Sequence, residues 1–405
     1  MCCCYHCIKR GAQDSGAYLK PDYITVKKLK RLTNVLLTIA AVVALAAIYV
    51  LNPILPTPTG PQSAALYAPG DLGLSSEPLA LIDNTRATMA NGEFPGQAFR
   101  ALNGEVWFPD NRDQGPYPLI VYSHGFMSSV SEAEYLVEFL VPKGYVIAAV
   151  DYPLSSGGSP GGPTVNDVLN QPGDASFVLD HLLARNTTEG DSLFGMIDPQ
   201  RIAAAGLSLG GLTSQLAAFH RDVRDPRFAA AVSIAGPAVF LTPEFFSTSN
   251  MPFMMIAGSS DAIIPYEAHA APIPQKSPQS LLVTLDGGTH VGFASIATTF
   301  MRWFNHPDEF ACPMLLQGLE NGDAPAEEMM PPDAAIGISA DAAAPCTMTE
   351  YERAMRPGEQ QMLTRLAMYS FLESVFAAAP ERRAQMETYL ISELAKEQPA
   401  VSLTM

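Results

Sequence analysis

The stretch Arg201–Gln215, RIAAAGLSLGGLTSQ, indicates how this chain folds. The apolar run at 202–205 leads directly into Gly-Leu-Ser208-Leu-Gly at 206–210, so a buried strand is expected to meet a tight turn. Leu212 and Leu216 then recur at helical spacing. Glycine on both sides of the serine lets the backbone bend sharply and leaves the hydroxyl exposed. The stretch therefore predicts a strand, a turn that carries Ser208, and a helix.

Similar apolar runs precede and follow this stretch. Residues 94–108 alternate between polar and apolar, which predicts an antiparallel edge pair. Buried strands are expected at 118–122, 145–150, 202–206, 229–234, 252–257 and 281–285, with helices at 131–140, 174–184 and after Ser208. Buried strands that alternate with helices indicate the α/β class, with a mostly parallel sheet covered on both faces. Ligands bind in such folds at the carboxyl ends of the strands.

The length, composition and charge of the chain limit its class. The 405 residues are 48% hydrophobic, which is enough for one large domain or one domain with an appendage. The 41 acidic and 24 basic residues give a net charge of -17. This charge argues against a nucleic acid or an anionic membrane surface as a partner.

Residues 32–51 form an uncharged apolar run that is long enough to cross a membrane. Lys and Arg residues precede it, and none follows until Arg86. This asymmetry predicts a transmembrane helix with a cytoplasmic N-terminus and an extracytoplasmic remainder, in the periplasm or at the cell surface if the source is bacterial. The alternative is a signal peptide that is cleaved to release a secreted protein.

Changes in composition predict the organisation of the chain. The segments are a basic, Cys-rich cytoplasmic tail (1–31), the transmembrane helix (32–51), a Pro- and Gly-rich linker (52–90), the α/β domain (91–305), an acidic, mobile low-complexity excursion (306–349), and C-terminal helices packed on the domain (350–405). Acylation or adventitious metal binding is an alternative to an unstructured tail for Cys2, Cys3, Cys4 and Cys7. Cys312 and Cys346 are the only cysteines after the apolar run, so a disulfide is expected between them.

A serine hydroxyl attacks an acyl carbon only if a base removes its proton and an acid orients that base. His290 follows the last predicted parallel strand on a Gly-flanked loop, whereas His269 and His306 are expected at the surface. Asp261 follows the strand at 252–257 and is the expected acid, with Asp286 as the second candidate. The sequence therefore predicts that Ser208, His290 and Asp261 act together.

The tetrahedral intermediate of acyl transfer needs N–H donors for its oxyanion. The backbone of Leu209 and the backbone of Phe126, in the loop after the strand at 118–122, are the expected donors, and His124 is expected to orient that loop. The Gly-rich stretch 154–171 is expected to form a loop over the site. Apolar residues near these motifs are candidates to line an acyl pocket: Phe126, Met127, Tyr152, Phe245, Phe246 and Met251.

Four motifs carry a family resemblance: SHGF (123–126), GLSLGG (206–211), GSSDAIIP (258–265) and GTHVGF (288–293). In this order they resemble the α/β-hydrolase esterases of the dienelactone-hydrolase-like and platelet-activating-factor-acetylhydrolase-like type, over residues 95–305. The resemblance implies the α/β-hydrolase fold, a Ser208–His290–Asp261 triad, and ester hydrolysis through an acyl-enzyme without metal or cofactor. Dienelactone hydrolases use a cysteine nucleophile where this chain has serine, so lactone specificity is not carried over.

The expected function is therefore hydrolysis of a carboxylic ester with an apolar or lipid-like acyl part. An acyltransferase uses the same triad and differs only in whether an alcohol or water resolves the acyl-enzyme. A catalytically silent binding module with this fold is a further alternative, and the complete set of expected catalytic residues argues against it.

Overall fold

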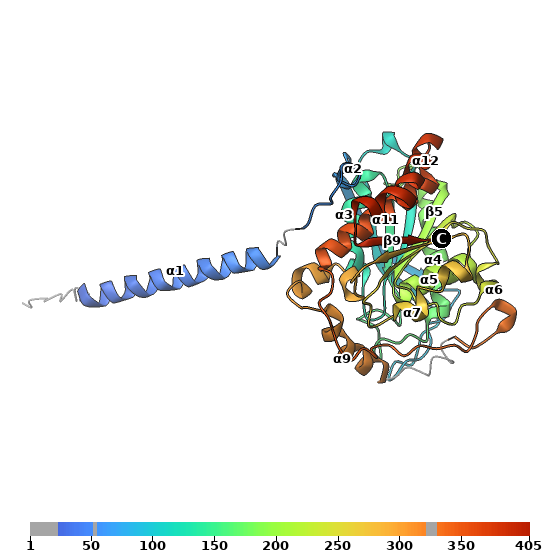
Figure 1. Ribbon diagram of the computed structural model, residues 1–405. Helices are drawn as coiled ribbons and strands as arrows, with labels where there is room; N and C mark the ends of the chain where they lie inside the picture. The colour runs from blue at the N-terminus through green and yellow to red at the C-terminus, as the bar shows by residue number, and fades with distance from the viewer. Residues whose placement is uncertain (1–22, 52–54, 321–329) are drawn as a thin grey trace, which may run out of the picture. The chain divides into compact units, whose positions relative to one another are not determined.

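The computed structural model describes residues 23–51, 55–320 and 330–405 (Figure 1). The chain divides into two units, Met1–Pro53 and Ile54–Met405. The first unit contains helix α1 (Tyr23–Leu51), in which Lys27–Tyr49 is long and apolar enough to cross a membrane. A signal sequence has the same length and composition. The tail cysteines Cys2, Cys3, Cys4 and Cys7 lie outside the described residues.

The second unit is built around a nine-stranded sheet in the order β1-β2-β4-β3-β5-β6-β7-β8-β9. The strands are β1 (Leu74–Asp83), β2 (Arg100–Pro109), β3 (Tyr117–Ser123), β4 (Val146–Asp151), β5 (Ile197–Leu207), β6 (Ala230–Ile234), β7 (Phe253–Gly258), β8 (Ser280–Leu285) and β9 (Val401–Thr404). The strands from β4 to β8 in this order pair in parallel, and β1, β2 and β9 pair antiparallel at the two edges. The predicted α/β class and the mostly parallel sheet are confirmed.

Helices cover both faces of this sheet because its central strands are apolar on both sides. Among the described residues of the second unit, the α-helices are α2 (Pro61–Tyr67), α3 (Glu134–Leu140), α4 (Gln171–Asn186), α5 (Leu209–Phe219), α6 (Pro243–Phe246), α7 (Tyr266–His269), α8 (Ile273–Lys276), α9 (Pro307–Glu320), α11 (Pro357–Phe376), α12 (Pro380–Thr388) and α13 (Leu394–Glu397). Every residue of β3, β6 and β7 is buried. α3 and α11 pack in the core of one face, and α4 and α5 pack on the other.

Two predictions about the ends of the sheet are wrong. The segment 52–90 is not only a linker, because it contains α2 and β1, and β1 pairs along its full length with β2. The Pro, Gly and Ser residues of this segment favour a linker, so the alternation of buried and exposed residues that begins at Leu79 was not recognised as a strand. The segment 350–405 does not consist of helices alone, because β9 follows them. This strand pairs with β8 and forms the other edge of the sheet.

The segment 306–349 also differs from the prediction of a mobile excursion without regular structure. Its first part is helix α9, and Asp308 in the first turn is fully buried. A disulfide joins Cys312 of α9 to Cys346, as expected. Beyond the undescribed residues 321–329, Ile338 forms isolated bridges with Leu241 and Asp333. The described parts of this segment are therefore attached to the α/β domain.

Candidate active site

Ser208 occupies a strained corner between β5 and α5. Its backbone has φ 57° and ψ -120°, a conformation that residues with a side chain rarely adopt. A Cβ atom on Gly206 would lie 2.3 Å from the carbonyl oxygen of Gly210, and one on Gly210 would lie 1.9 Å from that of Ser123. Only glycine at both positions lets the chain turn so tightly. The half-buried side chain of Ser208 is thereby presented at the carboxyl edge of the sheet.

His290 and Asp261 follow the neighbouring strands β8 and β7, and their side chains meet. Nδ1 of His290 lies 2.7 Å from Oδ2 of Asp261, and both residues are buried. The other oxygen of Asp261 accepts hydrogen bonds from the backbone N–H groups of Ile263 (2.9 Å) and Ile264 (2.7 Å). Asp286, the second candidate for the acid, is exposed and contacts the hydroxyl of Ser259. The structure therefore pairs His290 with the first candidate, Asp261.

Several negative charges surround the imidazole of His290. Burial of the ring is the largest single effect and opposes its protonation, whereas the charge and the hydrogen bond of Asp261 favour it. The charges of Asp308 and Glu132 act in the same direction, and the net result is that the pKa of His290 is raised above its usual value. The site thus favours the imidazolium that forms when a histidine accepts a proton.

The loop after β3 carries His124, Gly125 and Phe126. Nδ1 of His124 lies 2.7 Å from the carbonyl oxygen of Gly125, and Nε2 accepts a hydrogen bond from the backbone N–H of Tyr152 at 3.0 Å. Nδ1 therefore carries the proton of a neutral ring, and burial lowers the pKa of His124 accordingly. These contacts fit the loop-orienting role expected for His124.

Two backbone N–H groups in this region lack an acceptor among the residues that the structure describes. Within the part of the chain that the structure describes, neither Phe126 nor Leu209 donates a backbone hydrogen bond. Leu209 is the first residue of α5, and the first N–H groups of a helix have no acceptor within the helix. Both groups are therefore available to an external acceptor.

Glu132 is a buried group that the sequence analysis missed. Both of its carboxylate oxygens accept from the backbone N–H of Gly125 at 3.0 Å, and one accepts from the hydroxyl of Tyr122 at 3.1 Å. A Cβ on Gly125 would lie 3.0 Å from Oε2 of Glu132 and 3.3 Å from Cβ of Ser208. Burial raises the pKa of Glu132 to about 7. Glu134 and Glu138 nearby are exposed, so residue type alone could not distinguish Glu132 from them.

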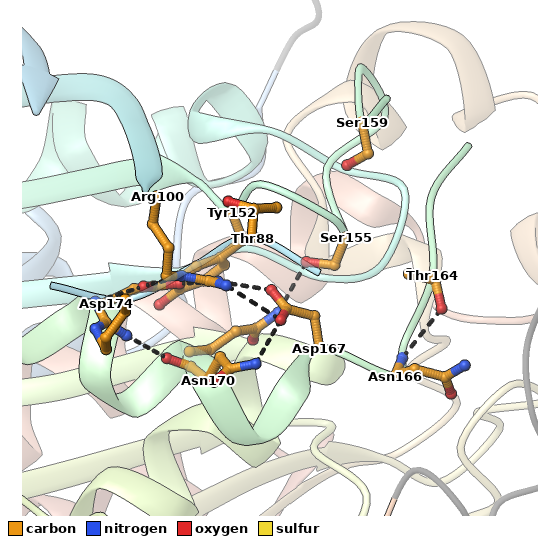
Figure 2. A network of polar contacts seen from close by, with 12 residues as sticks. Thr88, Arg100, Tyr152, Ser155, Ser159, Thr164, Asn166, Asp167, Asn170 and Asp174 are labelled. Atoms are coloured by element: carbon orange, nitrogen blue, oxygen red, sulfur yellow. Dashed lines mark hydrogen bonds and ion pairs between the residues drawn. The ribbon is translucent and has the colours of Figure 1, made fainter. Parts of the chain in front are cut away.

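A network of buried charges anchors the Gly-rich loop at 154–171 (Figure 2). The fully buried guanidinium of Arg100 donates hydrogen bonds to the carboxylates of Asp167 and Asp174. At the other end of the loop, the carbonyl oxygen of Ser155 accepts from the backbone N–H of Met127 at 2.9 Å. The loop therefore lies beside the segment that carries Phe126 and Met127, and its position over the site stays a prediction.

The predicted acyl-pocket residues do not lie together. Met127 is 38% exposed on the loop after β3. Tyr152 is fully buried, with its hydroxyl 2.6 Å from that of Ser123, so it belongs to the core. Phe246 packs against Phe219, at the far end of α5 from Ser208. Phe245 packs there with it, and Met251 precedes β7 and so lies at the amino edge of the sheet. The pocket predictions for Phe245, Phe246 and Met251 are wrong because sequence proximity to a motif does not specify the edge of the sheet. Tyr152 does follow the carboxyl end of β4, but its side chain is buried in the core and lines no open pocket.

Two further histidines differ from their expected surface positions. His269 is buried, and its Nδ1 accepts from the backbone N–H groups of Ala238 (2.9 Å) and Val239 (3.2 Å). Burial lowers its pKa to about 4. His306 is also buried, with its ring 5.0 Å from that of Tyr351. Among the described residues, no group of three or more His, Cys, Asp or Glu side chains is arranged to hold a metal ion.

The fold and the arrangement of these residues define the class, an α/β hydrolase with the features of a serine esterase. A family model described as "PETase: PET hydrolase-like" matches residues 99–305, just over half of the chain. The chain belongs to this PET hydrolase-like family. It is 26% identical to cutinase est1 of Thermobifida alba over 241 residues, which are 53% of this chain and 71% of that protein. It is also 26% identical to cutinase est2 of the same organism over 239 residues, which are 53% of this chain and 70% of that protein. The chain is therefore a serine carboxylic ester hydrolase.

Proposed function

We propose that the chain hydrolyses esters through a triad of Ser208, His290 and Asp261. The observation that carries the proposal is the buried 2.7 Å contact between His290 and Asp261, on the loops after β8 and β7, at the same edge of the sheet at which β5 leads into Ser208. In this mechanism, Nε2 of His290 takes the proton of the Ser208 hydroxyl as the oxygen attacks the ester carbonyl. Asp261 holds the proton on Nδ1 and stabilises the imidazolium. Collapse of the intermediate releases the alcohol, which takes that proton, and leaves an acyl-enzyme that water hydrolyses.

The oxyanion of the intermediate is proposed to bind the backbone N–H groups of Phe126 and Leu209. Both groups lack an acceptor among the described residues, and both lie next to predicted catalytic motifs. One such donor contributes roughly 2.7 to 4 kcal/mol to lowering the barrier. Glu132 supports this arrangement because its carboxylate holds the N–H of Gly125, the residue before Phe126.

The proposed substrate is an ester with an apolar or lipid-like acyl part. Met127 follows Phe126 on the loop after β3, and its exposed side chain is a candidate to contact the acyl part of the substrate. The family description names PET hydrolase and the two relatives are named cutinases, so polymeric esters belong among the substrates to be tested. We further propose that residues 27–49 anchor the N-terminus in a membrane, with the hydrolase domain on the extracytoplasmic side.

Replacement of the triad residues tests this proposal. Ser208→Ala and His290→Ala should each lower kcat for p-nitrophenyl acetate by at least about 1000-fold, and the double variant should lose no more than either single variant. A fluorophosphonate should label Ser208 in the wild type and leave Ser208→Ala unlabelled. Substantial turnover by either single variant would refute the triad.

A matched pair of carboxylate variants tests the acid. Asp261→Asn should lower kcat strongly, because an amide does not hold the histidine tautomer in the same way. Asp286→Asn removes the exposed carboxylate after the next strand and should retain wild-type activity.

An added alcohol acceptor shows whether water or the alcohol resolves the acyl-enzyme, because transfer yields a new ester rather than the free acid.

A further inference from the structure

Helix α9 lies outside the region 99–305 that matches the family model, yet it contacts the loop of Asp261 and the loop of His290. A Cβ on Gly318, near its C-terminal end, would lie 2.9 Å from the sulfur of Met127. Cys312 of α9 packs with Ala262 and Ile263, which follow Asp261. Residues 308 and 312 are one helical turn apart, so they lie on the same face of α9. This face of α9 packs against the active-site loops.

Asp308 makes three hydrogen bonds that join these loops. Its Oδ2 accepts from the backbone N–H of Ala262 at 3.0 Å and from that of His290 at 2.9 Å. Its Oδ1 accepts from the backbone N–H of Val291 at 2.8 Å. The side chain is fully buried. One carboxylate therefore connects the residue after Asp261 to His290 itself.

Such a connection limits how far the two loops can move apart. The N–H groups of Ala262 and His290 that Asp308 binds are buried, so moving either loop away from Asp308 would leave a buried donor without a partner. The loop of Asp261 is held again by the backbone N–H of Cys346, which donates to the carbonyl oxygen of Ala262 at 2.7 Å. A histidine base must keep its orientation closely, since a displacement of about 1 Å can lower a rate by about 100-fold.

We propose that Asp308 is a positioning residue for ester hydrolysis: its carboxylate binds the backbone of both loops and holds His290 and Asp261 in the geometry that proton transfer requires. The segment beyond residue 305 thereby contributes to the active site through a residue that touches neither substrate nor nucleophile. This inference rests on the proposed triad. The charge of Asp308 also acts on His290, together with the charges of Asp261 and Glu132.

Asp308→Asn tests the proposal in the full-length chain. The variant retains one acceptor oxygen but places an amide against backbone N–H groups that need an acceptor. With p-nitrophenyl acetate, kcat should fall by about 10- to 100-fold while KM stays within about twofold. Loss of the negative charge should also lower the pKa of His290, so the acidic limb of the kcat/KM profile should move to lower pH by about half a unit. A purely structural role would not move this limb.

Two further variants keep the test decisive. Glu309→Gln removes an exposed charge from the next position of α9 and should match the wild type in kcat and in pH profile. Asp308→Glu keeps the charge but changes its reach, so kcat should fall while the acidic limb stays in place. If Asp308→Asn fails to fold, Asp308→Glu decides the outcome. Wild-type kcat in Asp308→Glu, or wild-type kcat and pH profile in a folded Asp308→Asn, would overturn the proposal.

The triad and the positioning role fail in different ways. If the triad is wrong, Ser208→Ala retains activity whatever Asp308 does. If only the positioning role is wrong, Ser208→Ala is inactive and Asp308→Asn behaves like Glu309→Gln.

Discussion

The region 99–305 and the segment 306–349 contribute to the site in different ways. In the first region, Ser208, Asp261 and His290 each follow a buried strand directly or after a short turn, and glycine-rich motifs surround them. In the second, an acidic and Pro-rich stretch supplies Asp308, whose buried carboxylate binds the loops of the first region. A short motif is therefore sufficient to locate the residues proposed to react, but it does not locate the residue that supports them.

Apart from the loss of a triad residue, the largest expected effect concerns the Ser208 corner in the first region. In Gly210→Ala, the new Cβ would overlap the carbonyl oxygen of Ser123, and backbone has to move to relieve it. We expect a loss of at least about 100-fold in kcat/KM and a loss of about 3 kcal/mol or more in the free energy of unfolding, measured by ester hydrolysis and urea denaturation.

Gly158→Ala is the matched control, because a Cβ at Gly158 would have nothing within 4 Å. It should match the wild type in both measurements. Full activity in Gly210→Ala would show that the corner can relax, and that the steric limit argued for the first region does not hold.

The next effect concerns the second region. Removal of the disulfide in Cys312→Ala/Cys346→Ala should lower the free energy of unfolding by about 2–4 kcal/mol. Because the disulfide packs on Ala262 and Ile263, we also expect kcat to fall several-fold in the folded variant. Thermal unfolding and p-nitrophenyl acetate kinetics measure the two effects, and reduced wild-type protein should behave like the variant. Unchanged kcat would mean that the segment stabilises the fold without supporting the site.

The last effect is on stability alone and concerns Glu132, a buried carboxylate within the first region. Burial raises its pKa in the folded protein to about 7 from the usual 4.5, so the native state binds this proton more tightly than the unfolded state. Stability from this group is therefore present below about pH 4.5 and is lost as pH rises to about 7. In Glu132→Gln, the free energy of unfolding should lose this dependence, which amounts to roughly 3 kcal/mol across the window.

Urea denaturation at about pH 5 and about pH 8 measures this difference. Glu134→Gln changes an exposed carboxylate two residues away and should keep the wild-type dependence on pH. If Glu132→Gln and Glu134→Gln show the same dependence, Glu132 does not carry the buried proton that its surroundings indicate.

Most of the parallel sheet could be predicted because buried strands are continuous apolar runs, as in β3 and β7. The strands at the two edges could not. β1 alternates between exposed and buried positions within a Pro- and Ser-rich stretch, and β9 has only four residues. Each is a strand because a neighbouring strand offers unpaired backbone groups, a condition that does not exist until the sheet forms.

The candidate site also contains residues that could be predicted from the sequence and residues that could not. Ser208 lies in a turn whose conformation depends on glycines two residues away on each side, and Asp261 and His290 follow apolar strands, so local residue order was enough to locate all three. The burial of Asp308 and Glu132, and the packing of Phe246 far from Ser208, depend on segments that are distant along the chain. A carboxylate or a phenyl ring has the same local pattern at the surface, in the core or beside a catalytic loop. Its role is decided only when the folded chain places donors, charges or apolar side chains around it.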